Sequence, residues 1–421
     1  MNIILLTVDA LRFDHLSLYD YEVSTFPKLE PLNDESAHFT RTFSVSSHTR
    51  EAVPGLLTGQ FPDEAVSEGY HLDTETVAEP LRDAGYQTGA FHSNPFSSRA
   101  YGFDDSFDTF DDDLYLGNSK LIALAQRLWD KIRNEHYVRA AEINRRSLSW
   151  IDNLDREPFF LWNHYMDAHG PYEPPETIFK SVHNISKPDI NTRKLHRRSI
   201  NNPESITPQE REQLIELYDA EIRYVHKHIS TFLEALEDRD LLASSLVIIT
   251  ADHGEGFGEN GYYSHPRYLH DDLTHVPLIV SGPELPSGTY DAPVSTLDIV
   301  PTILQAAKET GSEGFPGMSL QNITTNSESM TDRVVFSQTR GEDDESELIR
   351  YSARTADDMA SLVWDTTDDT FEIRDETSDS TLREALHSHA SERNKTTARS
   401  AEPDELSSDV KERLEVLGYR E

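Results

Sequence analysis

Three short apolar runs constrain the fold of this chain more than any other feature of its sequence. They are NIILLTV at residues 2–8, PFFLW at residues 158–162 and SLVIIT at residues 245–250. None alternates between apolar and polar residues, which is typical of a strand covered on both faces. A segment with helical spacing at residues 207–235 leads into the third run. The pattern predicts an α/β fold with a large, mostly parallel sheet flanked by helices.

The composition changes near residue 330, and this change predicts two units. Residues 1–330 carry the α/β pattern, with further strands expected at 88–91 and 277–280. Residues 331–421 carry short strand candidates among carboxylates. We expect these to form a small antiparallel sheet closed by a terminal helix around Ser407–Leu417.

Two polar stretches have little periodicity. The first, Lys180–Pro208, leans basic and is expected to be a surface loop, with a lid over the site as the alternative. The second, Asp375–Glu405, is polar and is expected to be mobile.

Acidic residues outnumber basic ones twofold. Asp and Glu total 76 and Lys and Arg total 38, which gives a formal net charge of −38. Such self-repulsion is tolerated when salt screens it, since the Debye length is about 3 Å at 1 M salt. We therefore expect a halophilic protein from a salt-rich cytoplasm. The same charge argues against a nucleic acid as partner, because no basic stripe offsets it.

The sequence holds no cysteine, which excludes disulfides and thiolate-bound metals. Met1 is followed directly by the first predicted strand, so no signal peptide is expected. No apolar stretch reaches the ~20 residues needed to span a bilayer. These features predict a soluble cytoplasmic protein with no stable membrane span, and they give no indication of its oligomeric state.

Two of the predicted strands end in residues that bind metals. Asp9 directly follows the first apolar run. Asp252 and His253 follow the third run, after the single residue Ala251. Open α/β sheets place ligand-binding residues at the carboxyl ends of their strands. A carboxylate beside an imidazole suits a divalent cation such as Mn²⁺, Zn²⁺ or Fe²⁺. Each residue could instead be an ordinary loop residue, but the position at a strand end favours a ligand.

A third element, SSHTREAVPGLLTG at residues 46–59, brings hydroxyl groups to the start of a predicted helix. Thr49 stands where that helix would begin. Amides and the dipole at a helix N-terminus stabilise an anion, which would activate a hydroxyl there. The alternative is that Thr49 merely caps the helix. The residues alone leave both readings open.

Several segments together resemble the sulfatases and their phosphoesterase relatives in the alkaline phosphatase superfamily. They occur in the family's order and cover most of residues 1–320. The segments are VDALRFDH, STFPKLEPL, HTREAVPGLLTG, GYQTGAFHSNPF, AHGPYEPP, TADHGEGFGENG, THVPLIV, STLDIVPTIL and GFPGMSL.

The resemblance implies a site around one divalent ion, which would be Mn, Zn or Ca. In this family the nucleophile lies ten residues before the glycine of the LLTG segment, a position that Thr49 occupies here. Thr49 would then share the ion with Asp9, Asp252 and His253. As an alternative for part of the site, Asp167, His169 and His265 would hold a second metal.

The resemblance also implies roles around a small anionic ester substrate. His169 matches a family histidine that contacts the substrate anion or the leaving group, and His265 lies near a Lys or His of similar function. Asn94 falls where relatives place a side chain that hydrogen-bonds a non-bridging oxygen. Because the chain is so acidic, local positive charge from the metal, Arg50, Arg99 or Arg267 would have to hold the anion, although Arg99 is more readily explained as a surface charge.

Three positions depart from the pattern of true sulfatases. Thr49 replaces the Cys or Ser that is oxidised to formylglycine, and Val53 stands where an Arg follows it. Formylglycine catalysis is therefore not expected. Ala10 replaces a second Asp, so a calcium-type cage is one carboxylate short. These departures resemble phosphodiesterase, phosphonate-ester hydrolase or phosphoglycerol-transferase relatives.

The sequence thus predicts a metal-dependent hydrolase of a sulfate ester, phosphodiester or phosphonate ester. Thr49 would form a covalent ester, and His265 or His169 would protonate the leaving oxygen. One alternative is a transferase that passes the phospho or sulfo group to a sugar or lipid hydroxyl. The other is a catalytically silent protein that keeps the fold and the metal.

Overall fold

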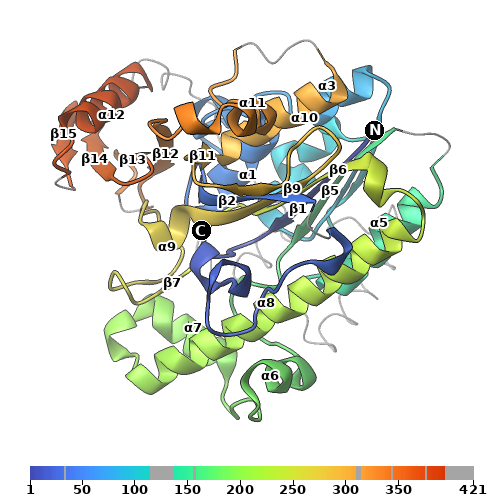
Figure 1. Cartoon of the computed structure of the whole chain (residues 1–421). Coiled ribbons are helices and arrows are strands. Elements are labelled where there is room, and N and C mark those ends of the chain that lie inside the picture. Colours follow the sequence, from blue (N-terminus) through green and yellow to red (C-terminus); the bar gives the residue numbers. More distant parts are fainter. Residues whose placement is uncertain are drawn as a thin grey trace.

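A computed structural model describes residues 1–32, 35–113, 137–154, 158–309, 314–342, 345–374 and 377–393. Within these ranges a nine-stranded sheet forms the centre, in the order β10-β2-β9-β6-β1-β5-β3-β4 with β11 beside β2 (Figure 1). Its strands are β1 (Asn2–Val8), β2 (Ser36–Phe43), β3 (Gln87–Phe91), β4 (Thr109–Asp111), β5 (Phe159–Tyr165), β6 (Ser245–Ala251), β9 (His275–Ser281), β10 (Gly288–Tyr290) and β11 (Val294–Ser295).

The sheet is mostly parallel, as the apolar runs predict. β1 lies at its centre and pairs in parallel with both β5 and β6. Every residue of these three strands is buried. The exceptions to parallel pairing are the contacts of β9 with β2 and with β6, which are antiparallel.

Helices cover both faces of the sheet, and each face has its own apolar core (Figure 1). Ile4 and Leu6 of β1 pack toward α5 and α8, whereas Ile3 and Leu5 pack toward α1 and α10. Among the described residues, no helix combines the length and apolar character needed to cross a membrane. The helices of these layers are α1 (Thr49–Thr58), α2 (Pro62–Ala65), α3 (Ala78–Asp83), α5 (Ala140–Ile151), α8 (Pro208–Glu237), α9 (Asp271–Thr274), α10 (Ile299–Ala307) and α11 (Leu320–Thr325).

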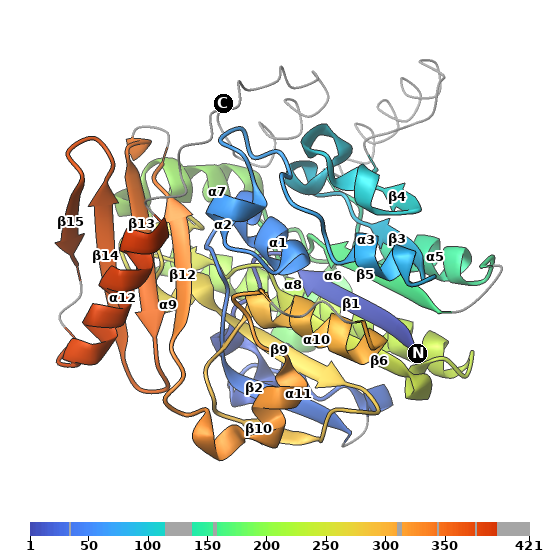
Figure 2. The same cartoon turned by 90° about the horizontal axis from the view of Figure 1, so that it is seen from above.

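A second, antiparallel sheet follows near the C-terminus, in the order β12-β13-β14-β15. Helix α12 (Ser380–Arg393) packs Leu382, Leu386 and Ala390 against it (Figure 2). Both features agree with the expectation of a small antiparallel sheet, while the helix expected at Ser407–Leu417 lies outside the described residues. The strands are β12 (Val335–Arg340), β13 (Leu348–Arg354), β14 (Met359–Asp365) and β15 (Thr370–Ile373).

Both segments that were predicted to lack regular secondary structure contain helices. Lys180–Pro208 is not a simple loop: α6 (Glu176–His183) reaches into it, and it contains α7 (Thr192–Asn201). These short helices bury only a few apolar side chains, such as Phe179 and Leu195, so their periodicity is weak in the sequence. The tract Asp375–Glu405 contains α12, whose buried residues recur every four positions.

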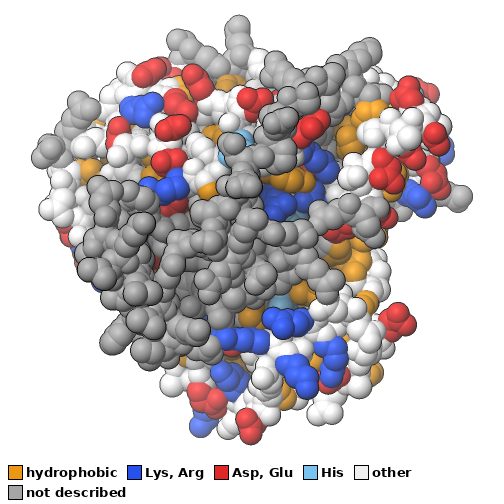
Figure 3. Space-filling model, turned by 180° about the vertical axis from the view of Figure 1, so that it is seen from behind, with side chains coloured by type: hydrophobic (Ala, Val, Ile, Leu, Met, Phe, Trp, Pro, Cys, Tyr) orange, Lys and Arg blue, Asp and Glu red, His pale blue; other side chains and the backbone are white. Residues whose placement is uncertain are grey.

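Helices α6 and α7 are also unusual in charge. Lys and Arg side chains gather at the lower end of the face seen in Figure 3, the end where both helices lie in Figure 1. Lys180, Lys194 and Arg197 are exposed there. The rest of the chain is strongly acidic, so this end of the molecule is a local exception.

Candidate metal and ester site

The carboxyl ends of β1 and β6 bring together three side chains of the types that bind metals. Val8 and Ala251 are paired in parallel register, so Asp9 and Asp252 leave the sheet at the same level. Ligand atoms of Asp9, Asp252 and His253 lie within 4.8 Å of one another, and all three residues are buried. Nε2 of His253 is 3.6 Å from Oδ1 of Asp9 and 3.6 Å from Oδ2 of Asp252.

This donor set fits a divalent cation. Oδ1 of Asp9 and Oδ2 of Asp252 are buried and have no hydrogen-bond partner. Burial alone would lower the pKa of His253, but the charges of Asp252 and Asp9 raise it above the ordinary value. Burial and the neighbouring Asp9 raise the pKa of Asp252. The pocket therefore attracts positive charge, and a metal ion would supply it without a proton.

The residue after Asp9 completes the turn out of the sheet. Ala10 adopts a left-handed backbone conformation with φ of 57°, which is uncommon for a residue other than glycine. Its amide donates to Oδ1 of Asp252 at 3.2 Å, and its carbonyl accepts from the Tyr218 hydroxyl at 2.7 Å. At this position the chain thus uses a backbone amide to hold Asp252.

Thr49 is the first residue of α1 and is fully buried. His48, not Thr49, caps the helix, because Nδ1 of His48 accepts a hydrogen bond from the Arg50 amide at 3.2 Å. The Thr49 hydroxyl lies 3.0 Å from Nε2 of His253. The capping alternative for Thr49 is therefore wrong in this structure, and its hydroxyl faces His253.

Two side chains orient Asp9. The Asn94 amide donates to Oδ2 of Asp9 at 2.7 Å, and Nε2 of His164 lies 3.3 Å from the same oxygen. Thr7 fixes the other side of the His164 ring, since its hydroxyl is 2.8 Å from Nδ1. Burial alone would raise the pKa of Asp9, but His169, His164 and His253 hold it well below the ordinary value.

A group of histidines closes the site beside His253. The ring of His265 lies 4.5 Å from that of His253 and 4.8 Å from that of His169. Nδ1 of His265 is 3.3 Å from Oε1 of Glu255, and the other Glu255 oxygen accepts from the Tyr172 hydroxyl at 2.9 Å. His265 is thus oriented by a buried carboxylate.

Burial decides the charge of these histidines when no substrate is bound. It lowers the pKa of His265 to about 3, with a further contribution from His253. It also lowers the pKa of His169, against the opposing effect of Asp9. Both imidazoles are neutral near pH 7, and an anion entering the site would favour their protonated forms.

Comparison with known proteins decides the family. Residues 1–309 match the Sulfatase family model. The chain belongs to the sulfatase family.

The relatives of this sulfatase-family chain are distant in sequence. It is 24% identical over 356 residues to the sulfatase YidJ of Escherichia coli, covering 76% of this chain and 70% of that protein. It is 22% identical over 366 residues to a choline-sulfatase of Rhizobium meliloti, covering 76% and 69%.

Solved structures share its fold. A protein in complex with its substrate D-glucosamine-2-N,6-O-disulfate superposes with a TM-score of 0.70 at 17% identity, covering 94% of this chain and 98% of that one. A phosphonate monoester hydrolase from Silicibacter pomeroyi has a TM-score of 0.65 at 19% identity, covering 93% and 94%.

The arginines expected to bind substrate lie beside the sulfatase site rather than on the metal-binding side chains. The Arg50 guanidinium carbon lies 4.2 Å from the centroid of the Phe96 ring. Arg267 is buried and donates to the Tyr70 hydroxyl at 2.5 Å. Nη1 of its guanidinium lies 3.9 Å from Oε1 of Glu51, and its backbone amide donates to Oε1 of Glu342 at 2.8 Å.

The structure gives no support to the alternative of a second metal on Asp167. Oδ1 of Asp167 is 2.8 Å from Nε of Arg139, and Oδ2 accepts from the Ala140 amide at 3.0 Å. Both oxygens are therefore engaged away from His169 and His265. Over the ranges that the structure describes, the metal-binding group is the one formed by Asp9, Asp252 and His253.

Sequence reasoning missed Glu255, His164 and Glu51 as parts of this site. Glu255 stands two residues after His253, and this closeness to a residue at a strand end could have indicated a role in the site. His164 is the penultimate residue of β5 and looks like an ordinary strand residue in the sequence. Glu51 lies within α1, and nothing in the sequence indicates that it is buried.

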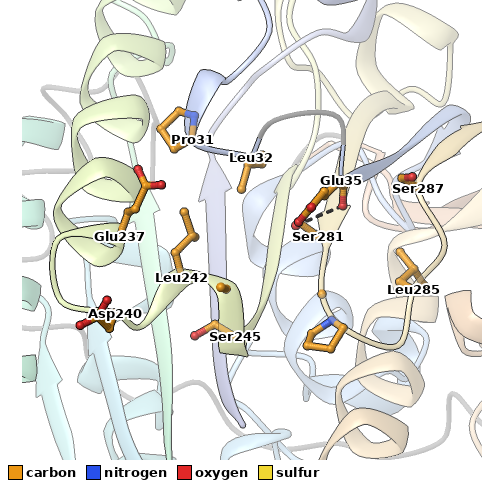
Figure 4. A pocket seen from close by; sticks show the side chains of 13 residues that line it. Pro31, Leu32, Glu35, Glu237, Asp240, Leu242, Ser245, Ser281, Leu285 and Ser287 are labelled. Atoms are coloured by element: carbon orange, nitrogen blue, oxygen red, sulfur yellow. Dashed lines mark hydrogen bonds between the residues drawn. The ribbon is translucent and has the colours of Figure 1, made fainter.

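A surface pocket of about 570 Å³ lies elsewhere, at the opposite end of the sheet (Figure 4). It includes Ser245, the first residue of β6, whereas Asp252 follows the last residue of that strand. Carboxylates of Glu35, Glu237 and Asp240 line it. Their negative charge does not suit an anionic ester.

Proposed function

We propose that the protein is a metal-dependent hydrolase that cleaves a sulfate ester, or the related phosphodiester or phosphonate ester, through a covalent ester of Thr49. The observation that carries this proposal is the position of the Thr49 hydroxyl, 3.0 Å from Nε2 of His253. The same nitrogen lies 3.6 Å from Oδ1 of Asp9 and 3.6 Å from Oδ2 of Asp252, two buried oxygens without hydrogen-bond partners. A hydroxyl, an imidazole and two unpaired carboxylate oxygens converge on one point.

The metal ion has two roles in this scheme. Held by Asp9, Asp252 and His253, a divalent ion would lower the pKa of the Thr49 hydroxyl and offset the charge of the ester when bound. The buried, unpaired oxygens of the two carboxylates are what supports the assignment of these ligands.

Thr49 is the nucleophile because its oxygen stands at the helix N-terminus facing the imidazole. The oxygen would attack sulfur or phosphorus, its proton would leave to solvent or to a neighbouring base, and the bond to the alcohol oxygen would break. Water then cleaves the Thr49 ester and restores the hydroxyl. Asn94 keeps Asp9 oriented throughout, through its 2.7 Å hydrogen bond.

His265 is better placed than His169 to give a proton to the leaving oxygen. Glu255 lies 3.3 Å from Nδ1 of His265, so the carboxylate would stabilise the imidazolium that forms before transfer. Nδ1 of His169 is instead 2.6 Å from the carbonyl of Gly170, a neutral partner. His169 would serve to hydrogen-bond the anion.

The class of ester follows from the relatives. Curated relatives include a choline-sulfatase and an arylsulfatase of Clostridium perfringens, and a phosphonate monoester hydrolase shares the fold. We propose a small sulfate ester as the first substrate to test, with phosphonate monoesters and phosphodiesters as the second.

The test is a rate panel at high salt. The metal-loaded protein, the chelator-treated protein and the Thr49→Ala variant are each assayed with 4-nitrophenyl sulfate, 4-nitrophenyl phenylphosphonate and bis(4-nitrophenyl) phosphate. We expect turnover of at least one ester that requires both the metal and Thr49. Equal turnover with and without Thr49 would overturn the covalent scheme, and a rate that needs an added alcohol would favour a transferase.

A further inference from the structure

Three guanidinium groups surround one tyrosine ring next to the site. The guanidinium carbons of Arg50, Arg267 and Arg340 lie 5.1, 5.3 and 4.8 Å from the centroid of the Tyr70 ring. Tyr70 has a left-handed backbone with φ of 62°. A bulky residue keeps this conformation only where its surroundings hold it, and such positions cluster at ligand-binding sites.

Two of the three arginines are committed to holding this arrangement. Arg267 donates to the Tyr70 hydroxyl at 2.5 Å, and the carboxylates of Glu51 and Glu342 face it. Arg340 donates to the carbonyls of Glu68 and Ser67, each at 3.0 Å, in the loop that carries Tyr70. Both groups have acceptors within the protein.

Arg50 differs from them. Its guanidinium carbon lies 4.2 Å from the Phe96 ring centroid, and its Nε is buried without a partner. In the part of the chain that the structure describes, no carboxylate forms an ion pair with it. An arginine stacked on aromatic faces keeps its N–H edges free for a carboxylate or another oxyanion.

The position of Arg50 is tied to the reacting groups. It follows Thr49 directly, and its amide is bound by the capping residue His48. The Phe96 ring beneath it belongs to the same turn as Asn94, whose Oδ1 accepts from the Phe96 amide at 2.9 Å. No hydrogen bond joins the Arg50 guanidinium to Thr49 or to the three metal-binding side chains, all of which the structure describes.

Positive charge exceeds negative charge around Tyr70. Three guanidinium groups are opposed by the carboxylates of Glu51 and Glu342, and this local excess of positive charge stands in a chain of net charge −38. Sites that hold an anion away from bulk solvent require such a surplus.

We propose that Arg50 binds a second anionic group of the substrate, separate from the ester that is cleaved. The substrate class is then an ester anion whose alcohol part carries a carboxylate, a sulfate or a phosphate. The inference rests on the proposed function for the position of the ester. The scissile group lies at Thr49, and the second oxyanion lies on the edge of the Arg50 guanidinium above Phe96.

Calorimetric titration of the metal-loaded Thr49→Ala protein tests this subsite without turnover. The probes are 4-nitrophenyl sulfate and two analogues with a carboxylate ortho or meta to the ester oxygen, together with the matching phenylphosphonates. We expect at least one carboxylate to tighten binding about tenfold, the size of one charge-assisted hydrogen bond. Adding Arg50→Gln should remove this gain and leave the parent probe within about twofold.

Two further variants make the result specific. Arg145→Gln removes the same charge from an exposed ion pair with Glu142 on α5, and it should leave the gain intact. Arg50→Lys keeps the charge without the planar stack, and it should retain part of the gain. This variant also decides the question if Arg50→Gln does not fold.

Three results overturn the inference: no gain from any carboxylate, equal weakening of parent and carboxylate probes by Arg50→Gln, or the same loss in Arg145→Gln. Equal weakening would mean that Arg50 holds the ester itself. Failure of the unsubstituted protein to turn over any ester would count against the proposed function instead, because the calorimetry reads binding alone.

Discussion

Oγ1 of Thr49 lies 3.0 Å from Nε2 of His253, although 204 residues separate them in the sequence. Thr49 begins a helix on one face of the sheet, and His253 follows a strand at its centre. Their contact places the hydroxyl beside the carboxylates of Asp9 and Asp252. The proposed roles of Thr49 and of the metal ion both depend on this arrangement.

Replacing Thr49 by Ala should lower kcat by at least about a thousandfold, because the attacking oxygen is lost. Thr49→Ser keeps the oxygen and should retain most of the activity. Metal content, measured by mass spectrometry, should be unchanged in Thr49→Ser. A Thr49→Ala protein with normal kcat would show that water attacks the ester directly.

Divalent ions should stabilise the protein, because they neutralise the buried oxygens of Asp9 and Asp252. At a concentration of one hundred times Kd the gain is about 2.7 kcal/mol. Thermal unfolding with Mn²⁺ or Zn²⁺ against chelator measures the rise in Tm.

Asp252→Asn should abolish most of that rise, since it removes one charged ligand. Glu237→Gln, which changes a carboxylate at the distant pocket, is the matched control and should keep it. An equal rise in Tm for Asp252→Asn and the unsubstituted protein would place the metal elsewhere.

Replacing His265 by Gln should slow esters of poor leaving groups far more than esters of good ones. Proton transfer to the leaving oxygen contributes about a hundredfold or more, and only when the alcohol is a weak acid. A plot of log kcat against leaving-group pKa should therefore become steeper. If His169→Gln steepens the plot and His265→Gln does not, the proton donor is His169.

Glu51→Ala should destabilise the fold by about 3–5 kcal/mol, since it removes a buried carboxylate that faces Arg267 and leaves the buried donors bonded to it without an acceptor. Glu51 is fully buried and accepts from the hydroxyls of Ser46 and Thr339 at 2.8 and 2.7 Å. It also accepts from the Arg340 amide at 3.2 Å. Urea unfolding measures the loss, with Thr339→Val as a milder control of about 1 kcal/mol.

Protonation of His389 in acid should weaken the packing of α12 against Phe336 and Phe61. Its ring stacks 4.2 Å from Phe336 and lies 4.7 Å from Phe61, and burial lowers its pKa to about 3. The unfolded chain binds a proton at this residue below about pH 6.5, whereas the folded protein resists it. Stability should therefore fall between pH 6.5 and 3, by at most about 1.4 kcal/mol per pH unit.

His389→Phe should reduce the fall in the free energy of unfolding between pH 7 and pH 5. Urea unfolding at pH 7, 6 and 5 measures it. His387→Phe changes an exposed histidine of the same helix and should leave the pH dependence of the free energy of unfolding unchanged. Parallel curves for His389→Phe and the unsubstituted protein would contradict the prediction.

The central strands were predictable because burial on both faces leaves a direct trace in the sequence. The runs at β1, β5 and β6 are continuous and apolar, and residues after β1 and β6 meet as strand-end geometry requires. β2 was not predictable in the same way. Its sequence SAHFTRTF mixes polar and apolar residues, and its antiparallel pairing with β9 contains an irregularity after Phe39.

The supporting residues of the site depend on contacts between distant segments. Glu51 is buried because β12 closes over α1, and Glu255 matters because His265 and Tyr172 reach it. No local pattern in the sequence encodes these contacts. The helices α6, α7 and α12 were missed for a related reason: each buries a narrow row of side chains against a neighbour.

The central position of β1 has a consequence for how the protein is made. The ribosome produces β1 before both of its neighbours in the sheet, which are residues 159–165 and 245–251. β1 therefore lacks its second neighbour until residue 251 has been made, and Asp9 meets Asp252 and His253 only after that point. Metal capture at the proposed site is thus tied to the pairing of β1 with β6 and follows it.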